Sequence, residues 1–392
     1  MGAAGLTLAI AAGALSAAWC AFLLHGLRTA LRFRRFADLS APLPASWPRL
    51  SVIVAACDEE ETIGPALETL LAQDYPELEI VVVDDRSRDA TGRIADAAAR
   101  RDPRLAAVHV SALPDGWLGK VHALDRGVAA ARGDWLLFTD ADVHFSSDVL
   151  RRAVAYAEAE RLDHLTVAPE LIAPGFVEEM VNAAFVTAFL AGTRAIDVGR
   201  SGSKAFVGVG AFNLVRRSTF ARTPGFRWLA MEVLDDVGLG LMMKNAGGRA
   251  AFAIGLGDVT ITWYRSLRAM ARGLEKNMFG AFCHYRVRRL LAILAGAAVV
   301  LPAPLVALGI EPRPWLPLLG GAALALVAAN ALVLSIRARR PWLPLALAPL
   351  GAAVFVGLVT RSAWRCLRDG GITWRGTLYP LDALRDGQRV KL

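Results

Sequence analysis

The chain has 392 residues, of which 55% are hydrophobic, and it carries a formal net charge of +8. Its mean hydropathy of +0.41 is too high for an ordinary soluble domain, in which apolar residues including Gly make up about 45–50%. These values exclude a simple soluble protein. They do not indicate a nucleic-acid partner, because many Arg residues flank apolar stretches, where anionic lipid headgroups are the simpler partner.

Residues 1–27 contain no Asp, Glu, Lys or Arg. As a helix they are long enough to cross the roughly 30 Å hydrocarbon core of a membrane. A cleaved signal peptide is disfavoured, because the positive charges follow the apolar residues instead of preceding them. We therefore predict an uncleaved anchor over residues 1–35. By the positive-inside rule the next domain is cytoplasmic, since the anchor ends in Arg28, Arg32, Arg34 and Arg35.

Residues 48–289 have the composition of a globular domain, in which apolar runs alternate with helical segments. The predicted strands are residues 50–56, 79–84, 105–110 and 135–139. The helical segments between them are residues 63–72, 91–101 and 120–131. This alternation predicts an α/β fold with a mostly parallel sheet flanked by helices, and with ligands at the carboxyl ends of the strands.

Carboxylates follow three of the predicted strands: Asp58-Glu59, Asp84-Asp85 and Asp140-Ala141-Asp142. Because the carboxyl ends of parallel strands meet at one edge of the sheet, we expect these side chains to gather there. Oxygen ligands at that edge would hold a hard divalent cation, Mg²⁺ or Mn²⁺, as a diphosphate substrate requires. For any one pair taken alone, a solvated strand end is the alternative.

The second half of the domain is less regular. Residues 205–214 predict a strand or hairpin with a glycine bend, and residues 232–244 predict a helix near a third acidic cluster, Glu232 and Asp235-Asp236. Residues 263–289 mix aromatic and basic side chains, which is typical of a helix lying along the bilayer surface. No Gly-x-Gly-x-x-Gly follows the first strand, so a Rossmann dehydrogenase is disfavoured.

Three further stretches without charged residues follow the domain, at residues 290–310, 314–336 and 341–360. The third contains Pro341, Pro344 and Pro349, so we favour a re-entrant segment over a full span. A re-entrant segment would return the basic tail to the cytoplasm. The predicted parts are an anchor over 1–35, a catalytic domain over 48–289, transmembrane or re-entrant helices over 290–360, and a tail over 361–392.

The four cysteines are scattered and include no Cys-x-x-Cys pair: Cys20, Cys57, Cys283 and Cys366. Neither a zinc site nor a disulfide framework is indicated, which suits a domain in the cytoplasm.

Six segments form an ordered set: Ser51-Val52-Ile53-Val54 with Asp58-Glu59, Val83-Asp84-Asp85-Arg86-Ser87, Gly119-Lys120 with Ala123-Leu124, Thr139-Asp140-Ala141-Asp142, Gly208-Val209-Gly210-Ala211-Phe212 and Asp235-Asp236-Val237-Gly238-Leu239-Gly240. Together they resemble the family-2 inverting glycosyltransferases over residues 50–244. That resemblance implies a nucleotide-diphospho-sugar transferase fold of the GT-A type, and a nucleotide-diphospho-sugar as the donor.

The resemblance also implies roles in donor binding. Asp85 would read the nucleotide base, Asp140 would lie near the ribose, and Asp142, with Asp140 beside it, would bind Mg²⁺ or Mn²⁺. Asp58 and Glu59 belong to the same donor site.

The remaining roles concern the phosphate and the acceptor. Lys120 would meet the donor phosphate, with a solvated lysine as the alternative. Asp236 would be the general base that deprotonates the acceptor hydroxyl, and Asp235 competes for that role. A carboxylate on the helix surface is the alternative for Asp236.

Two departures from the family pattern matter. No Gln-x-x-Arg-Trp follows the acidic pair, which favours transfer of one or very few sugars over polymerisation. Arg86 stands where many members have Gly, which would alter the base pocket.

Two segments that flank the apolar stretches narrow the resemblance further: Trp263-Tyr264-Arg265-Ser266 with Glu275-Lys276-Asn277, and Ile372-Thr373-Trp374-Arg375-Gly376-Thr377-Leu378-Tyr379. They are similar to membrane-bound bacterial enzymes of the carotenoid- and hopanoid-associated glycosyltransferase type. The similarity implies a lipid acceptor and an enzyme integral to the inner membrane.

The sequence leaves other functions open. A polyprenyl-phosphate sugar transferase is the nearest rival. A nucleotidyltransferase should show a Gly-rich loop after the first strand, which is absent. A catalytically silent membrane scaffold or a sugar-lipid transporter would belong to a different class. The apolar stretches carry no charged residue to mark a transport path.

Overall fold

The computed structural model describes residues 3–309 and 315–391, and the chain forms two compact units. One unit contains Met1–Phe33, Ala173–Leu190 and Tyr264–Ala363, and the other contains Arg34–Ile172, Ala191–Trp263 and Trp364–Leu392. The predicted apolar stretches at 1–27, 290–310 and 314–336 and the predicted tail reach residues 1, 2, 310, 314 and 392, which lie outside the described residues.

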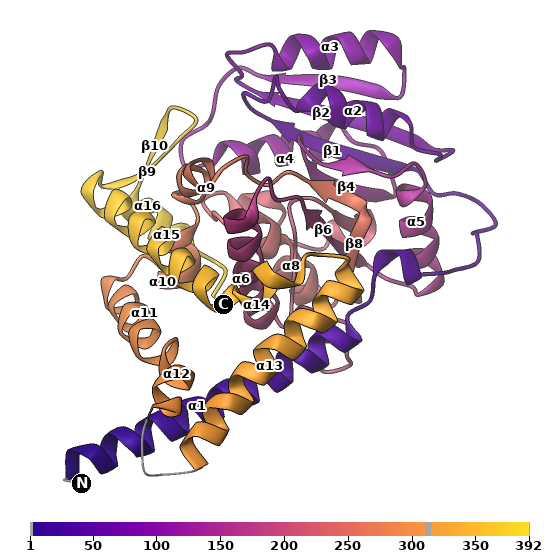
Figure 1. Cartoon of the computed structure of the whole chain (residues 1–392). Helices are drawn as coiled ribbons and strands as arrows, with labels where there is room; N and C mark the ends of the chain where they lie inside the picture. Colours follow the sequence, from indigo (N-terminus) through magenta and orange to yellow (C-terminus); the bar gives the residue numbers. More distant parts are fainter. Residues whose placement is uncertain (1–2, 310–314, 392) are drawn as a thin grey trace. The chain divides into compact units, whose positions relative to one another are not determined.

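An eight-stranded sheet forms the centre of the second unit, in the order β3-β2-β1-β4-β7-β6-β8-β5 (Figure 1). The strands are β1 Leu50–Ala56, β2 Leu78–Asp85, β3 Leu105–Val110, β4 Trp135–Asp140, β5 His144–Phe145, β6 His164–Leu171, β7 Asn213–Arg216 and β8 Ala250–Ile261. Strands β3, β2, β1 and β4 run parallel, as do β6 and β8, whereas β7 is antiparallel to both of its neighbours. The predicted fold class, a mostly parallel sheet flanked by helices, is confirmed.

Helices cover both faces of the sheet because alternate residues of its buried strands point to opposite sides. On β1, Val52 and Val54 pack into one apolar core with Leu67 of α2, whereas Ile53 packs into another with Leu124 of α4. The helices of this unit are α2 Ile63–Leu71, α3 Thr91–Arg101, α4 Gly119–Ala130, α5 Val149–Ala159, α7 Arg217–Phe220, α8 Asp235–Asn245 and α16 Leu381–Gly387. Short 3-10 turns lie at Phe36–Asp38, Ala195–Asp197 and Phe226–Leu229.

The first four predicted strands and the helices between them match the structure within one or two residues. The predicted strand at 205–214 is wrong over most of its length, because only Asn213 and Leu214 join β7. The chain before β7 instead lies against the start of α8: a Cβ on Gly208 would lie 1.8 Å from the Asp236 carbonyl oxygen. That close backbone contact replaces a strand ladder.

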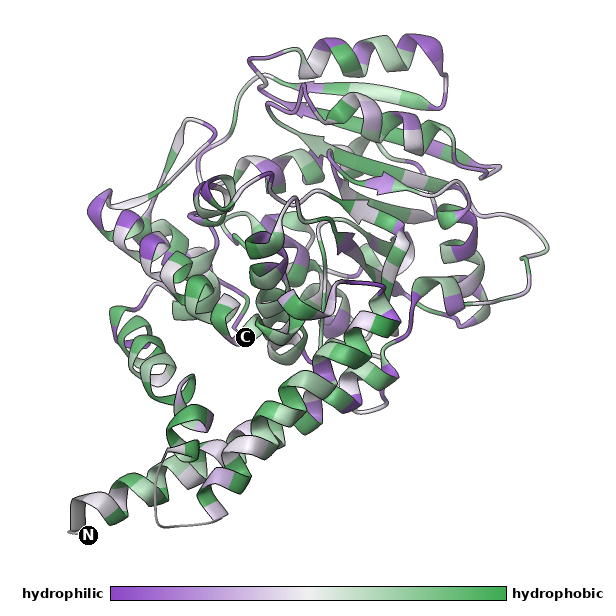
Figure 2. Cartoon of the chain, in the orientation of Figure 1, coloured by the Kyte–Doolittle hydropathy of each residue, from purple (hydrophilic) through white to green (hydrophobic). Residues whose placement is uncertain are grey.

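The other unit consists of helices with mostly hydrophobic residues (Figure 2). They are α1 Ala3–Arg32, α6 Phe176–Thr193, α9 Leu267–Leu274, α10 Met278–Cys283, α11 Val287–Val300, α12 Ala303–Leu308, α13 Trp315–Ala338, α14 Trp342–Ala346 and most of α15 Ala348–Arg368. Within the described residues, 5 helices are long and apolar enough to cross a membrane: α1, α6, α11 with α12, α13 and α15. The sequence pattern missed α6 because Glu178 and Glu179 interrupt its first turn.

Three of these helices pack side by side. Helix α13 lies along α1 and α12, and Asn330 Nδ2 donates a hydrogen bond to Leu23 O at 3.0 Å. Trp19 Nε1 donates to Val300 O at 2.6 Å. Helix α15 instead contacts α6, where a Cβ on Gly351 would lie 2.3 Å from Met180 O.

Two predictions about the end of the chain are refined by the structure. Residues 263–289 form α9, α10 and the start of α11 instead of one surface helix, and the backbone turns at His284 and Tyr285, with φ of 49° and 56°. The tail folds into an antiparallel hairpin, β9 Gly371–Trp374 and β10 Thr377–Pro380, followed by α16. This hairpin belongs to the unit that holds the sheet.

Candidate functional site

The acidic segments predicted from sequence meet at one edge of the sheet. Strands β2, β1 and β4 are parallel neighbours, and Ala55 pairs with both Val83 and Asp140. The loop after β1, the end of β2 and the end of β4 therefore open on the same edge. Asp58-Glu59, Asp85 and Asp140-Ala141-Asp142 lie there, as their spacing predicts.

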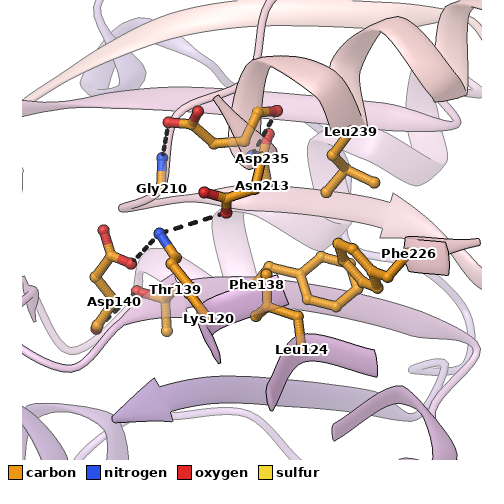
Figure 3. Close-up of a pocket in the computed structure, with 11 residues that line it drawn as sticks. Lys120, Leu124, Phe138, Thr139, Asp140, Gly210, Asn213, Phe226, Asp235 and Leu239 are labelled. Carbon is orange, nitrogen blue, oxygen red and sulfur yellow. Dashed lines mark hydrogen bonds and ion pairs between the residues drawn. The ribbon is translucent and has the colours of Figure 1, made fainter. Parts of the chain in front are cut away.

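Lys120 connects the acidic end of β4 with the acidic start of α8 (Figure 3). Its Nζ lies 2.6 Å from Asp140 Oδ1 and 3.5 Å from Asp235 Oδ2. Burial by itself would lower the pKa of this ammonium, but Asp140, Asp235 and Asp236 outweigh burial and raise the pKa. Lys120 is therefore a permanent cation. It is paired with carboxylates, so the alternative of a solvated lysine does not describe it.

Asp236 also lines this pocket. Its Oδ2 accepts a hydrogen bond from Gly210 N at 2.8 Å, and its Oδ1 accepts one from Val237 N at 2.8 Å. Burial, together with the negative charge of Asp235, raises the pKa of Asp236 to about 6. A carboxylate held in one orientation, with a pKa near neutrality, has the properties that a general base requires.

Buried polar side chains form a hydrogen-bond network that begins at the backbone carbonyl of Asp236. Asn213 Nδ2 donates to the Asp236 carbonyl oxygen at 3.5 Å, and Asn213 Oδ1 lies 2.9 Å from His164 Nε2. Thr166 Oγ1 donates to the same Asn213 oxygen at 3.1 Å. Burial lowers the pKa of His164 to about 4, so its ring is neutral and donates to Asn213. Sequence reasoning missed these residues, since no local motif marks them.

The rest of the pocket is apolar. Leu124, Phe138, Phe226 and Leu239 line it next to the charged residues (Figure 3). Phe138 and Phe226 meet edge to face, with ring centroids 5.1 Å apart. Apolar walls strengthen the electrostatic interactions of the charged groups, because they exclude water from one side.

Asp140 and Asp142 carry the chemistry expected of a metal site. Burial, followed by the charges of Asp140 and Glu59, raises the pKa of Asp142 to about 7. The negative charges of Asp140 and Glu59 disfavour ionisation of Asp142, and a cation would relieve that repulsion. No three His, Cys, Asp or Glu side chains form a metal-binding group among the described residues. Two carboxylates with substrate phosphates suffice for Mg²⁺, so the residues fit such an ion.

Asp85 is bound by its neighbour along the chain. Arg86 Nε and Nη2 donate to the two Asp85 carboxylate oxygens, both at 2.8 Å, and the Asp85 side chain is only 4% exposed. Arg86 has φ of 58°, a backbone conformation that favours Gly. A Gly would adopt this conformation without the strain that Arg86 carries. A ligand can therefore reach Asp85 in two ways. Either it contacts the Asp85–Arg86 pair, or Arg86 first releases Asp85.

The loop after β1 is fixed by two other segments. Asp58 N donates to Ser87 Oγ at 3.0 Å, and Arg88 N donates to Asp58 Oδ1 at 2.8 Å. Arg375, from the hairpin of the tail, donates to Glu59 Oε1 at 2.6 Å and to Asp58 O at 3.0 Å. Its position next to the loop could not be derived from sequence, because 316 residues separate Arg375 from Glu59.

Two of the acidic residues noted in the sequence have structural contacts. Asp84 Oδ2 pairs with His109 Nδ1 at 3.0 Å. Glu232 is 1% exposed, and its Oε2 accepts hydrogen bonds from Arg389 N at 2.6 Å and Val390 N at 2.8 Å. Glu232 therefore attaches the end of the tail to the loop before α8.

Most of the sheet-forming segment is similar to one known protein family. The sequence profile described as Glycosyl transferase family 2 matches residues 51–223. The 4,4'-diaponeurosporenoate glycosyltransferase of Staphylococcus aureus is 30% identical over 218 residues, which is 54% of this chain and 56% of that protein. The beta-monoglucosyldiacylglycerol synthase of Synechocystis is 38% identical over 112 residues, or 28% of this chain and 23% of that protein. The chain thus spans less than two thirds of these relatives.

Among solved structures, the mannosyltransferase PcManGT of Pyrobaculum calidifontis, in complex with GDP-Man and Mn²⁺, is similar over 92% of this chain and 99% of that chain. The two share 21% sequence identity, and the TM-score is 0.49.

Proposed function

We propose that the protein transfers a sugar from a nucleotide-diphospho-sugar to a lipid acceptor at the membrane surface, because residues 51–223 match the Glycosyl transferase family 2 profile. The arrangement that best supports this proposal is the pocket in which Lys120, Asp140 and Asp236 meet. It places a cation for phosphate, a carboxylate for a metal or ribose, and a raised-pKa base around one space.

The proposed mechanism is a single displacement with inversion at the sugar carbon. Asp236 takes the proton of the acceptor hydroxyl, the acceptor oxygen attacks the sugar carbon, and the nucleoside diphosphate leaves. Hydrogen bonds from Gly210 N and Val237 N orient the Asp236 carboxylate for this step. Asp235 is the alternative base, but it faces Lys120.

The leaving diphosphate needs positive charge. Lys120 supplies one cation. Its ammonium would exchange the ion pair with Asp140 for one with the leaving diphosphate. Asp142 and Asp140 would hold Mg²⁺ or Mn²⁺, which when bound acts as a Lewis acid on the leaving diphosphate. Asp58, Glu59 and Asp85 would form the nucleotide end of the site, with Arg86 as a gate on Asp85.

The proposed acceptor is a lipid. Two relatives have names that refer to diaponeurosporenoate and to diacylglycerol, and the chain has helices apolar enough to cross a membrane. An active site near the bilayer avoids moving a lipid through water. A polyprenyl phosphate is the alternative acceptor, and it would need additional cations instead of a strong base.

The path of the chain supports a proposal for the side of the membrane. Arg34–Ile172, Ala191–Trp263 and Trp364–Leu392 belong to one compact unit, which must lie on one side of a bilayer. The chain therefore crosses an even number of times between these segments. Helix α6, a single helix between two of them, would not cross, and only two of the later three candidate helices would.

The packing of the helices supports a choice of two. Helices α11–α12 and α13 pack with α1, whereas α15 contacts α6. We therefore assign three crossings, α1, α11–α12 and α13, with α6 and α15 at the membrane surface. With Arg28–Arg35 inside, residues 48–289 and the tail over 361–392 lie in the cytoplasm, next to the inner membrane.

The test of function is a transfer assay with the purified full chain in lipid nanodiscs, using radiolabelled nucleotide sugars and lipid extracts. Labelled lipid should form with the wild type and not with Asp236→Asn. Label on a polyprenyl phosphate would support the alternative acceptor. If the wild-type protein labels no lipid with any nucleotide sugar, the proposed transfer is rejected, and a catalytically silent membrane scaffold becomes the better hypothesis.

Metal dependence has a separate test. Asp142→Asn should abolish transfer and weaken the binding of nucleoside diphosphate with Mn²⁺, as measured by calorimetry. The Glu160→Gln variant, on the exposed end of α5, is the control and should behave as the wild type. Full activity of the wild type in excess EDTA would contradict the metal assignment.

A further inference from the structure

The hairpin of the tail has an unusual turn. Trp374 pairs with Thr377, so Arg375 and Gly376 form a two-residue turn, and their φ values are 48° and 78°. Positive φ at both central residues defines a type I′ turn, for which Asn-Gly is preferred. An Arg in this conformation is strained relative to its usual backbone. A strained residue at this place suggests that its side chain has a task.

The side chains of the hairpin contact two separate segments of the sheet unit. Arg375 Nη2 donates to Glu59 Oε1 at 2.6 Å, and Nη1 donates to Asp58 O at 3.0 Å. Asp58 itself has φ of 53°, so two strained residues share one hydrogen bond. At the other end of the hairpin, Tyr379 OH accepts a hydrogen bond from Gly119 N, the first residue of α4, at 3.2 Å.

Both contacted segments border the proposed nucleotide site. A Cβ on Gly119 would lie 2.4 Å from Asp85 Oδ2 and 2.8 Å from Arg86 Nη2, so the start of α4 is pressed against that ion pair. The hairpin thus spans the edge of the site from the loop after β1 to the N-terminus of α4.

We propose that hairpin β9–β10 is a clamp that completes the nucleoside diphosphate site, with Arg375 and Tyr379 as positioning residues. Arg375 fixes the loop that carries Asp58 and Glu59, and Tyr379 fixes the first turn of α4 next to Lys120. The inference rests on the proposed function, since it assumes that a nucleotide binds at this edge. It assigns the C-terminal tail to donor binding.

The tail has a second attachment, which makes the clamp testable. Glu232 binds Arg389 N and Val390 N independently of the hairpin, so loss of Arg375 leaves the tail attached. Arg375→Asn removes the guanidinium and installs the residue that the turn prefers. This variant should therefore fold at least as stably as the wild type.

The experiment uses the full chain in detergent. Binding of UDP, GDP, ADP, CDP and TDP with Mn²⁺ is measured by calorimetry, and the nucleotide that binds is kept for all variants. Arg375→Asn should weaken binding about tenfold, the equivalent of losing one charged hydrogen bond. In the transfer assay the KM for the donor should rise in proportion, with kcat changed less than about twofold. Arg375→Lys should be intermediate, and Tyr379→Phe should weaken binding.

Asp382→Asn is the matched control, because it removes an exposed ion pair with Arg385 in the same tail. It should bind nucleotide as the wild type does, and thermal unfolding should show every variant folded. If Arg375→Asn unfolds, Arg375→Lys and Tyr379→Phe decide by the same KM readout. A wild type that binds nucleotide, with Arg375→Asn binding equally well, would overturn the clamp alone. A wild type that binds none of the nucleotides would overturn the proposed function and the clamp with it. A fall in kcat at constant KM would also reject the positioning role.

Discussion

A single lysine holds the acidic residues of two distant segments together. Lys120 pairs with Asp140 at the end of β4 and approaches Asp235 at the start of α8. Without that cation, the carboxylates around the pocket would repel one another at close range. The lysine therefore sets the spacing of the site before any substrate enters it. Its own charge is secured by the same carboxylates, which raise its pKa.

We expect Asp236→Asn to lower kcat by about 10²–10⁴-fold, the range of a general base, while donor affinity stays nearly unchanged. Asn has the shape of Asp but cannot take the acceptor proton. Single-turnover transfer and nucleotide calorimetry on the same preparation separate these two effects. Asp235→Asn is the comparison: a deeper loss there would exchange the two roles, and undiminished transfer in both variants would reject a base at this position.

His164 should make stability depend on pH. The pKa of the folded-state ring is about 4, below the roughly 6.5 of an unfolded His. As the pH falls from about 6.5 to 4, His164 becomes protonated in the unfolded chain but stays neutral in the folded chain. The free energy of unfolding therefore decreases over that pH range. The full effect approaches about 3 kcal/mol, at about 1.36 kcal/mol per pKa unit. His164→Gln, which keeps a donor for Asn213 but does not titrate, should lose less stability between pH 7 and pH 5 in thermal unfolding. An equal loss in both proteins would contradict this assignment.

At the scale of elements, the glycine-rich segment before β7 acts as a spacer between the sheet and α8. A Cβ on Gly210 would lie 2.5 Å from Asp140 Oδ2, and one on Gly240 would lie 2.1 Å from Val207 O. These glycines let the segment and the helix approach until Gly210 N reaches the Asp236 carboxylate. The close approach, and not a turn, is what requires Gly here.

Gly208→Ala should therefore displace the start of α8. The added methyl would lie 1.8 Å from the Asp236 carbonyl oxygen, and a backbone atom cannot move aside as a side chain can. We expect loss of transfer and a fall of about 1–3 kcal/mol in unfolding free energy, the usual range for overpacking. Gly64→Ala in α2 is the control, since its methyl would meet only Ile94 at 3.8 Å and Ala favours a helix. Equal activity of the two variants would show that the segment tolerates movement.

At the scale of the whole molecule, the membrane crossings can be measured in intact cells. In a background without the four native cysteines, single cysteines at Asp134, Asp382 and Gly309 are treated with an impermeant reagent. Gly309, at the end of α12, should be labelled, whereas Asp134 and Asp382 should be labelled only after lysis. Labelling of Asp382 in addition to Gly309 would mean that α15 crosses, and labelling at Asp134 would reverse the whole orientation.

The sequence by itself predicts the sheet and its acidic edge. The runs at 50–56 and 135–139 are buried on both faces, so their apolar residues are continuous and their ends are marked by Asp58 and Asp140. Parallel strands with their carboxyl ends at one edge follow from that alternation alone. These predictions succeed because the signal is local: each strand carries both its own pattern and the residues that follow it.

Tertiary structure decides which acidic residues are free to act and which segments complete the site. Glu232 and Asp236 lie four residues apart and look alike in sequence, yet Glu232 binds the backbone of the tail and Asp236 faces the pocket. Arg375 reaches Glu59 across 316 residues, and Tyr379 reaches Gly119 across 260. Helix α6 resembles a span by composition, but the strands on either side of it belong to one compact unit. A hydrogen bond between distant segments depends on the path of the whole chain. The local sequence around Arg375 or Tyr379 does not indicate which residue it contacts.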